Sequence, residues 1–476
     1  MNKQTWGFAI VWIGITVIFG VAAFVGIYLA YDTSADDLPN EGGVSLPNTL
    51  TPQLAAVTVN ATPVPTLLPI ASPTNTIAPT TPPTATELLV AQAIEATATS
   101  APTATFAPTV LPVSDTTFAV GIQIQQSITF TEDYQRMWFN DALGLGLHWY
   151  KQQIRWEDIE TARGQYDWAI LDFALPIASE MGLKVLISIT ASPDWARPAG
   201  IIANDGPPAD YQDFANFLAA MLQRYPNMIH AIEVWNEPNL DREWMGSRGV
   251  MAAEYVELLR IANQTIKNID PGVIVISAAL SPTGGLPAEN GRERAIDDFA
   301  YLDQLIAAGL LNNCDCIGVH HNGYNIGPSV PWDNVPSDPG AVFRGPWDNP
   351  HHSWSLYSTL NTYHNKVATA GGMQPLCITE FGWASTEGLG EGNPAGFEFA
   401  LDNTLDEQAT WFVEALNNME EWGWVWLAMI WNLNYAPQAG WDVTNDNVPY
   451  SLIGPANQQR PAMAAIRAWS AARSGQ

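Results

Sequence analysis

The chain has 476 residues, 47% of them hydrophobic, which suits one large globular domain and is too short for four. Its 19 Lys and Arg stand against 48 Asp and Glu. This acidity argues against nucleic acid as a partner, because phosphates attract basic proteins. It fits a neutral substrate such as a glycan, or it serves solubility alone.

An apolar segment lies close to the N-terminus. Residues 1–5 precede a run over residues 6–31 that carries no charge. A helix needs about 20 apolar residues to cross a membrane, so this run predicts a transmembrane anchor. Lys3 precedes it and Asp32 follows, which places residues 1–5 in the cytoplasm and the rest of the chain outside the cell membrane. A cleaved signal peptide fits less well, since its apolar region spans only about 7–15 residues.

A linker over residues 32–115 follows the predicted anchor. It is rich in Pro, Thr, Ala and Val, and no Lys or Arg occurs between Lys3 and Arg136. Proline removes backbone donors and favours extended conformations, so a packed core is not expected here. Thr/Pro tracts of this kind are typical of O-glycosylated stalks.

Short apolar runs alternate with amphipathic helical patterns over residues 116–476. Eight strands are predicted, over residues 118–124, 149–156, 184–190, 231–236, 273–279, 316–321, 376–381 and 425–431. Strands that alternate with helices indicate parallel βαβ units. Eight units favour a closed (β/α)₈ TIM barrel, although the count alone also allows an open doubly wound sheet.

Two glutamates stand at the ends of predicted strands. Glu237 follows the fourth strand in IEVWNEPNL, and Glu380 lies near the end of the seventh in CITEFGWAS. In a barrel, both strand ends face one mouth, where catalytic residues gather. Glycoside hydrolysis needs one carboxylic acid to protonate the leaving oxygen and a second carboxylate on the other face of the sugar. A solvated surface charge is a poor alternative, because each glutamate follows an apolar run.

These motifs resemble clan A glycoside hydrolases, among them the cellulase-like family 5 and the β-xylosidase-like family 39. The resemblance covers residues 118–470 in the order of elements, but its specific motifs, Asn-Glu-Pro and Glu-Phe-Gly-Trp, are short. It implies a (β/α)₈ barrel that retains anomeric configuration. It also implies that Glu237 is the acid/base, that Glu380 is the nucleophile, and that Asn236 binds the hydroxyl beside the anomeric carbon.

Further substrate-binding residues follow from the same resemblance. Arg155 ends the second strand, where the family often places an arginine that would keep the nucleophile ionised; a purely structural ion pair is the alternative. His320, His321 and Tyr324 follow the sixth strand in VHHNGYN. The usual His-x-Tyr spacing is not kept, so the sequence does not decide which histidine acts.

Tryptophan is abundant in the predicted barrel. Of the 20 Trp, all but Trp6 and Trp12 lie in residues 116–476. Aromatic rings pack on the C–H faces of sugars. Trp431, after the eighth strand, matches the family's sugar platform, and Trp195, after the third, is a second candidate; core packing is the alternative for both. The Gly- and Pro-rich segment 323–354 is either a wall of the cleft or a decorative insertion.

The sequence suggests neither a metal site nor a cofactor. Cys314, Cys316 and Cys377 have no histidine at ligand spacing beside them, and no nucleotide-binding glycine motif occurs in strand–helix context. Cys316 and Cys377 start consecutive strands, so one disulfide is possible, but buried free thiols are the favoured expectation.

The sequence therefore predicts a monomeric, membrane-tethered retaining glycosidase that acts on β-linked oligo- or polysaccharides outside the cytoplasm. Two alternatives remain open at this point. One is a barrel that binds glycans without cutting them, and the other is a transglycosylase that remodels cell-surface polysaccharide. Nothing in the residues identifies the sugar, the linkage, or internal against terminal cutting.

Overall fold

The computed structural model describes residues 117–474 apart from 202–203, 290–292, 339–340 and 342–350. The predicted anchor and linker therefore lie outside the described residues. Within the described part of the chain, no helix combines the length and the apolar character that crossing a membrane requires.

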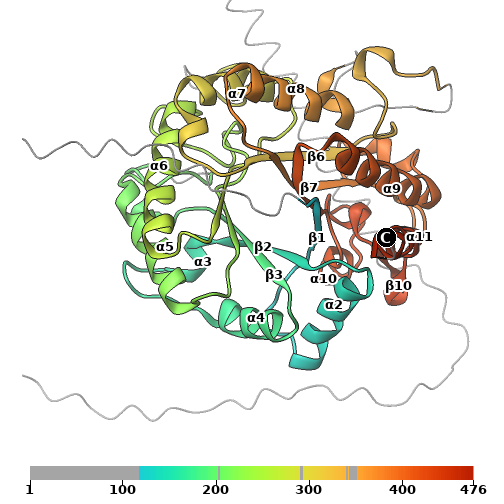
Figure 1. The fold of residues 1–476 in the computed structure, drawn as a ribbon, viewed down its shortest axis with the longest axis horizontal. Coiled ribbons are helices and arrows are strands. Elements are labelled where there is room, and N and C mark those ends of the chain that lie inside the picture. The colour runs from blue at the N-terminus through green and yellow to red at the C-terminus, as the bar shows by residue number, and fades with distance from the viewer. Residues whose placement is uncertain (1–116, 202–203, 290–292, 339–340, 342–350, 475–476) are drawn as a thin grey trace, which may run out of the picture. The chain divides into compact units, whose positions relative to one another are not determined.

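Eight parallel strands form one sheet, and helices surround it (Figure 1). The strands are β1 (Ala119–Gln123), β2 (Trp149–Arg155), β3 (Lys184–Thr190), β4 (Ala231–Val234), β5 (Ile274–Ser277), β6 (Ile317–Gly323), β7 (Leu376–Trp383) and β8 (Val425–Ile430). The main helices are α2 (Glu132–Gly144), α4 (Ala169–Glu180), α5 (Tyr211–Arg224), α6 (Ala252–Ile269), α7 (Asp298–Ala307), α8 (Leu356–Thr369), α9 (Leu405–Trp422) and α11 (Pro461–Ser474). Each predicted strand is confirmed, with small differences at its ends.

The sheet closes on itself between β5 and β6. The strand order runs β5-β4-β3-β2-β1-β8-β7-β6, and a parallel bridge joins Ile276 to Cys316 at the two outer strands. Gly318 makes this approach possible, since a Cβ at that position would lie 2.1 Å from the carbonyl oxygen of Ser277. The fold is therefore a TIM-barrel-like α/β fold, and the open-sheet alternative is excluded.

Apolar side chains fill the lower part of the barrel interior. This layer takes residues from seven of the eight strands or their first flanking residues: Trp149, Leu186, Ala231, Ile276, Cys316, Cys377, Trp426, Leu427 and Met429. Side chains alternate between the two faces of a strand, so the next inward positions are Lys151 on β2 and Glu233 on β4. Both are fully buried. The barrel therefore changes from apolar to charged as its strands approach their carboxyl ends.

The helices bury the faces that their periodicity predicts. In α5, Phe214, Phe217, Leu218 and Met221 are fully buried, and Asp210 caps the helix by accepting from the backbone N–H of Gln212. A capping box opens α9, where Thr404 and Glu407 each bind the backbone N–H of the other. These caps fix the residues at which α5 and α9 begin, and therefore how each helix leads into the next strand.

Cys316 and Cys377 form a disulfide, so the expectation of free thiols at these two positions was wrong. The cause is the register of β6 and β7, which pairs Gly318 with Cys377 and brings the two Cα atoms to 5.9 Å. Sequence spacing alone does not reveal this register. Cys314 is a buried free thiol, as expected.

Candidate active site

Glu237 is held by an unusual backbone turn after β4. Trp235 has φ 79° and Glu237 has φ 39°, both in the left-handed region that residues with a side chain rarely adopt. The indole N–H of the fully buried Trp235 donates to the carbonyl of Glu243, and the Glu237 N–H donates to the carbonyl of Ala279 beyond β5. Strained positions of this kind concentrate at functional sites.

Glu380 enters the barrel through an irregularity in β7. Val319 and His320 of β6 pair with Ile378 and Glu380, so Thr379 is an extra residue in β7. In a regular strand, residues three apart point to opposite faces. The extra residue lets Cys377 and Glu380 both face the interior, which is the usual effect of a β-bulge beside an active site.

Lys151 lies beneath Glu380 inside the barrel. Its Nζ is 3.0 Å from Oε1 of Glu380, 3.1 Å from the carbonyl oxygen of Thr379 and 3.3 Å from Oε2 of Glu233. Burial alone lowers the pKa of Lys151, but the charges of Glu233 and Glu380 outweigh it and raise the pKa. The side chain is therefore an ammonium with three partners, as its three N–H donors require.

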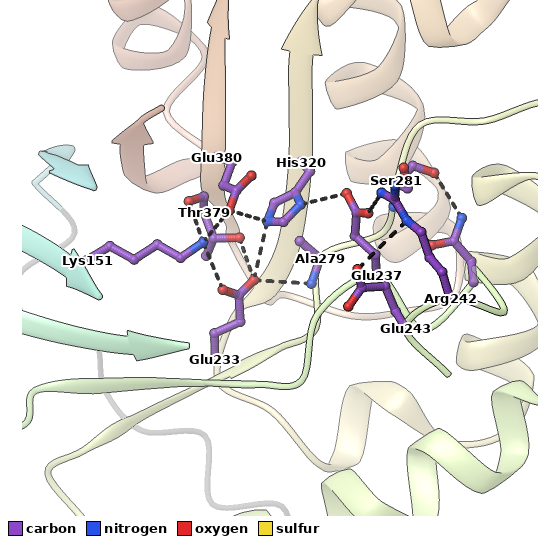
Figure 2. A network of polar contacts seen from close by, with 11 residues as sticks. Lys151, Glu233, Glu237, Arg242, Glu243, Ala279, Ser281, His320, Thr379 and Glu380 are labelled. Atoms are coloured by element: carbon purple, nitrogen blue, oxygen red, sulfur yellow. Dashed lines mark hydrogen bonds and ion pairs between the residues drawn. The ribbon is translucent and has the colours of Figure 1, made fainter. Parts of the chain in front are cut away.

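The imidazole of His320 lies between the two predicted catalytic carboxylates (Figure 2). Its Nδ1 is 3.1 Å from Oε1 of Glu237, and its Nε2 is 3.8 Å from Oε1 of Glu380. Nε2 also lies 3.8 Å from Oε1 of Glu233. Burial lowers the pKa of His320, but the charge of Glu380 and the hydrogen bond to Glu237 outweigh burial and raise it.

The pKa of Glu237 is lowered rather than raised. Burial raises it, but the hydrogen bond and charge of His320, with the charge of Arg242, bring it from 4.5 down to about 2. The two basic side chains contact Glu237 directly, while Glu380 lies beyond the imidazole.

Arg242 and Glu243 form the outer side of this network (Figure 2). Nη2 of Arg242 is 3.0 Å from Oε2 of Glu237, and its Nε is 3.8 Å from Oε1 of Glu243. Burial and the charge of Glu237 raise the pKa of Glu243 to about 7. Three basic side chains, Lys151, His320 and Arg242, thus alternate with the carboxylates from the barrel interior to the surface.

Arg155 does not supply the cation at Glu380. Its guanidinium binds Asp205 and Glu157 instead, and Lys151 contacts Glu380. Arg155 lies four residues further along β2, which places it about 13 Å beyond Lys151 at roughly 3.3 Å per residue. Arg155 therefore forms an ion pair at the end of β2, as the structural alternative predicted.

The structure separates the two adjacent histidines. His320 faces the carboxylates, whereas His321 points to the outside of the barrel near Ser353, where burial lowers its pKa to about 4. Tyr324 packs edge-on against Phe399 at 4.9 Å. Burial and the charges of Asp298 and Glu237 raise the pKa of Tyr324.

Two further predicted residues, Trp431 and Asn236, lie in different parts of the site. Trp431 is 7% exposed and belongs to an aromatic cluster after β8, with its ring 4.7 Å from Tyr435. Burial and the charge of Glu380 raise the pKa of Tyr435. Asn236 is buried beside Glu243 and lowers the pKa of that carboxyl group. The substrate contacts proposed for Trp431 and Asn236 remain predictions.

Trp195 packs away from these carboxylates. Its indole N–H donates to the carbonyl of Glu160, its ring meets Trp156 edge-on, and the guanidinium of Arg163 lies 4.6 Å from its centre. These contacts favour core packing over a sugar platform. In segment 323–354, Trp332 is 37% exposed, whereas residues 342–350 lie outside the described part of the chain.

Four contributors to the site were missed in the sequence: Lys151, Glu233, Arg242 and Glu243. A signal for the first two was present, because a charged residue inside an apolar strand must be paired when it is buried. Lys151 stands in WYKQQIRW and Glu233 in AIEVWN. Arg242 and Glu243 follow the Asn-Glu-Pro motif in a loop, where no periodic pattern indicates their direction.

A second group of His and Asp lies at the start of α7. Asp297, His351 and His352 bring potential ligand atoms within 4.8 Å of one another. However, Nδ1 of His351 accepts the backbone N–H of Ser353, so the proton of the neutral ring sits on Nε2, the nitrogen that faces Asp297. Nε2 of His352 is 2.7 Å from Asp297. The arrangement is a hydrogen-bonded connection between α7 and the segment before α8.

No protein-family model and no curated protein sequence matches this chain. The fold is similar to a family 39 glycoside hydrolase from Bacteroides cellulosilyticus WH2, with TM-score 0.50 and 17% identity, over 74% of this chain and 63% of that one. A monomeric β-xylosidase from Caulobacter crescentus CB15 gives 0.49 and 19%, over 74% and 68%. XacCel5A, solved with cellopentaose, gives 0.46 and 12%, over 75% and 100%.

The chain spans less than two thirds of the length of the first of these proteins. At such identities the likeness concerns the fold alone. The chain is thus an eight-stranded α/β barrel whose fold is similar to that of a family 39 glycoside hydrolase.

Proposed function

We propose that the protein is a retaining β-glycoside hydrolase in which Glu380 is the nucleophile and Glu237 the acid/base. One observation carries the proposal. Carboxylates from two strands that are not neighbours, β4 and β7, both contact the ring of His320 within the barrel. If His320 only stabilised the fold, it would not need two buried carboxylates beside its ring, because burial of each charge costs free energy.

The cations around Glu380 suit a nucleophile. Lys151 holds Oε1 at 3.0 Å and so fixes the carboxylate within the barrel. Attack on the anomeric carbon then forms an ester between Glu380 and the sugar and expels the leaving oxygen. Retaining enzymes keep the two carboxyl groups about 5–5.5 Å apart, which leaves no space for a water in the first step.

The leaving oxygen needs a proton from Glu237. Oε1 of Glu237 faces His320, so the proton that reaches the leaving group must sit on Oε2. A neutral His320 with a protonated Glu237 has the same net charge as the ion pair, so the network can hold this form without an uncompensated charge. In the second step Glu237 takes a proton from water, which attacks the ester and releases Glu380.

We also propose that the anchor over residues 6–31 tethers the barrel outside the cytoplasmic membrane and that the substrate is an oligo- or polysaccharide. The apolar run with Lys3 before it and Asp32 after it supports the tether. The acidic composition supports a neutral glycan.

The test is a screen of the full-length chain against aryl β-glycosides and polysaccharides, with variants at both carboxylates. Glu380→Ala should abolish turnover of every substrate. Glu237→Ala should slow substrates with poor leaving groups by roughly 10²–10⁴-fold and activated aryl glycosides far less. Equal losses on both substrate types would contradict the acid role of Glu237.

Proton NMR of the first product separates retention from inversion. A β-glycoside should first release the β-anomer, and an α-anomer would contradict the nucleophile role of Glu380. Binding without turnover would instead indicate a glycan-binding barrel. Products extended by an added sugar acceptor would indicate a transglycosylase, which shares the covalent intermediate.

A further inference from the structure

The two oxygens of Glu237 face opposite surroundings. Oε1 points to His320, whose side chain is 1% exposed, while Oε2 accepts from Arg242, whose side chain is 64% exposed. The Glu237 side chain itself is 10% exposed. A molecule that arrives from solvent therefore reaches Oε2 and meets the guanidinium of Arg242 there.

A second carboxylate, that of Glu243, lies close enough to bind Arg242 instead. Oε1 of Glu243 is 3.8 Å from Nε of Arg242, and the Glu243 side chain is 18% exposed. Asn236 lies beside Glu243 and lowers the pKa of that carboxyl group. A small rotation of the long Arg242 side chain is enough to exchange one carboxylate for the other, because Nη2 faces Oε2 of Glu237 and Nε of the same guanidinium faces Oε1 of Glu243.

We propose that Arg242 is a guard on the acid/base. In the free protein, its guanidinium occupies the place of the leaving oxygen at Oε2 of Glu237, and it moves onto Glu243 when a glycoside enters. This inference rests on the proposed function and makes Arg242 a positioning residue. When the leaving group displaces Arg242 from Glu237, Glu237 becomes ready to transfer its proton.

The exchange changes the protonation of both carboxylates. When the guanidinium leaves Glu237, a charge that lowers the pKa of Glu237 is lost, so Glu237 takes up a proton more readily. When it reaches Glu243, the pKa of Glu243 falls from about 7 and its proton is released. The other charged and titratable groups acting on this trio are His320 on β6, Asp205 after β3, Asp446 after β8, Tyr324 after β6 and Tyr363 on α8.

The test compares two pH profiles of the full-length chain. The profile of kcat/KM reports the free protein, and that of kcat reports the complex with substrate. Arg242→Met should move the basic limb of kcat/KM upward by about 1–3 pH units, the effect of an opposite charge in contact. The basic limb of kcat should stay in place, since Arg242 has already left Glu237 in the complex.

Three further variants sharpen the result. Arg242→Lys keeps the cation and should keep the wild-type profile. Arg248→Met is the matched control, because Arg248 lies in the same loop as Arg242, is 66% exposed and binds Glu254 in the first turn of α6; it should leave both limbs unchanged. Glu243→Gln removes the negative charge that attracts Arg242 away from Glu237, so kcat should fall severalfold on poor leaving groups and little on activated ones.

Two outcomes would contradict the proposed guard role of Arg242, each for a different reason. If Arg242→Met moves neither limb, or moves both equally, Arg242 does not leave Glu237 on binding. Thermal melts of each variant show whether a change reflects misfolding. A wild-type chain that turns over no glycoside overturns the proposed function itself, and the guard with it.

Discussion

Nζ of Lys151 lies 3.0 Å from Oε1 of Glu380 inside the barrel, although the two residues belong to strands β2 and β7 that do not pair with each other. The contact is possible because both strands direct a side chain to the barrel axis at the same height. Lys151 and Glu233 are fully buried, and Glu233 also accepts from the hydroxyl of Thr379 at 2.5 Å. The floor of the site is thus a buried ion-pair network.

Removal of Lys151 should destabilise the fold strongly. Lys151→Met leaves the buried charge of Glu233 without its main partner, and loss of one member of a buried pair costs about 3–5 kcal/mol in the free energy of unfolding. Denaturant unfolding measures this loss. Lys366→Met removes an ion pair with Asp303 at the surface and should cost only about 0–1 kcal/mol. The double variant Lys151→Met, Glu233→Gln should regain part of the stability, and no recovery would argue against the pair.

The contact between His320 and Glu237 predicts a pH window of stability. The pKa of Glu237 is lowered from 4.5 to about 2, so its contribution is present above pH 4.5 and is lost as the pH falls through about 2. The pKa of His320 is raised from 6.5, so its contribution is present below pH 6.5 and is lost as the pH rises through the raised value. The stability difference between wild type and His320→Gln should therefore be largest between pH 4.5 and 6.5. Unfolding curves at a series of pH values check this, and a difference independent of pH would contradict it.

The disulfide between Cys316 and Cys377 should add to stability. It closes a segment with a sequence separation of 61, for which restriction of the unfolded chain gives about 4 kcal/mol. The double variant Cys316→Ala, Cys377→Ala should unfold at correspondingly lower denaturant, while its barrel still forms. Thiol alkylation of the unfolded, unreduced protein should modify Cys314 alone. Three modified thiols without reductant would show that the disulfide is absent.

The predicted anchor can be tested on cells. Protease added to intact cells or spheroplasts should trim the barrel, because residues 6–31 would hold it outside the cytoplasmic membrane. The chain should sediment with membranes, and a chain that starts after residue 31 should not. Complete protection of the barrel inside sealed cells, with release only on lysis, would rule out this topology.

The sequence by itself determined the succession of eight strands and the two carboxylates at their ends. Both depend on local information: short apolar runs between amphipathic patterns, and glutamates placed directly after such runs. Glu237 and Glu380 could therefore be assigned to one mouth before their contacts were known. The resemblance to known barrels added roles for them, but it suggested Arg155 where the structure has Lys151.

Only the tertiary structure decided which charges neutralise one another. The bulge at Thr379 turns Glu380 inward, the register of β6 and β7 places His320 beside it and joins Cys316 to Cys377, and the turn after β4 brings Glu237 onto the same imidazole. Each contact joins residues from strands that are distant in the chain. Such contacts follow from strand register and barrel closure, which set side-chain distances to within about an ångström and which no local pattern of residues encodes.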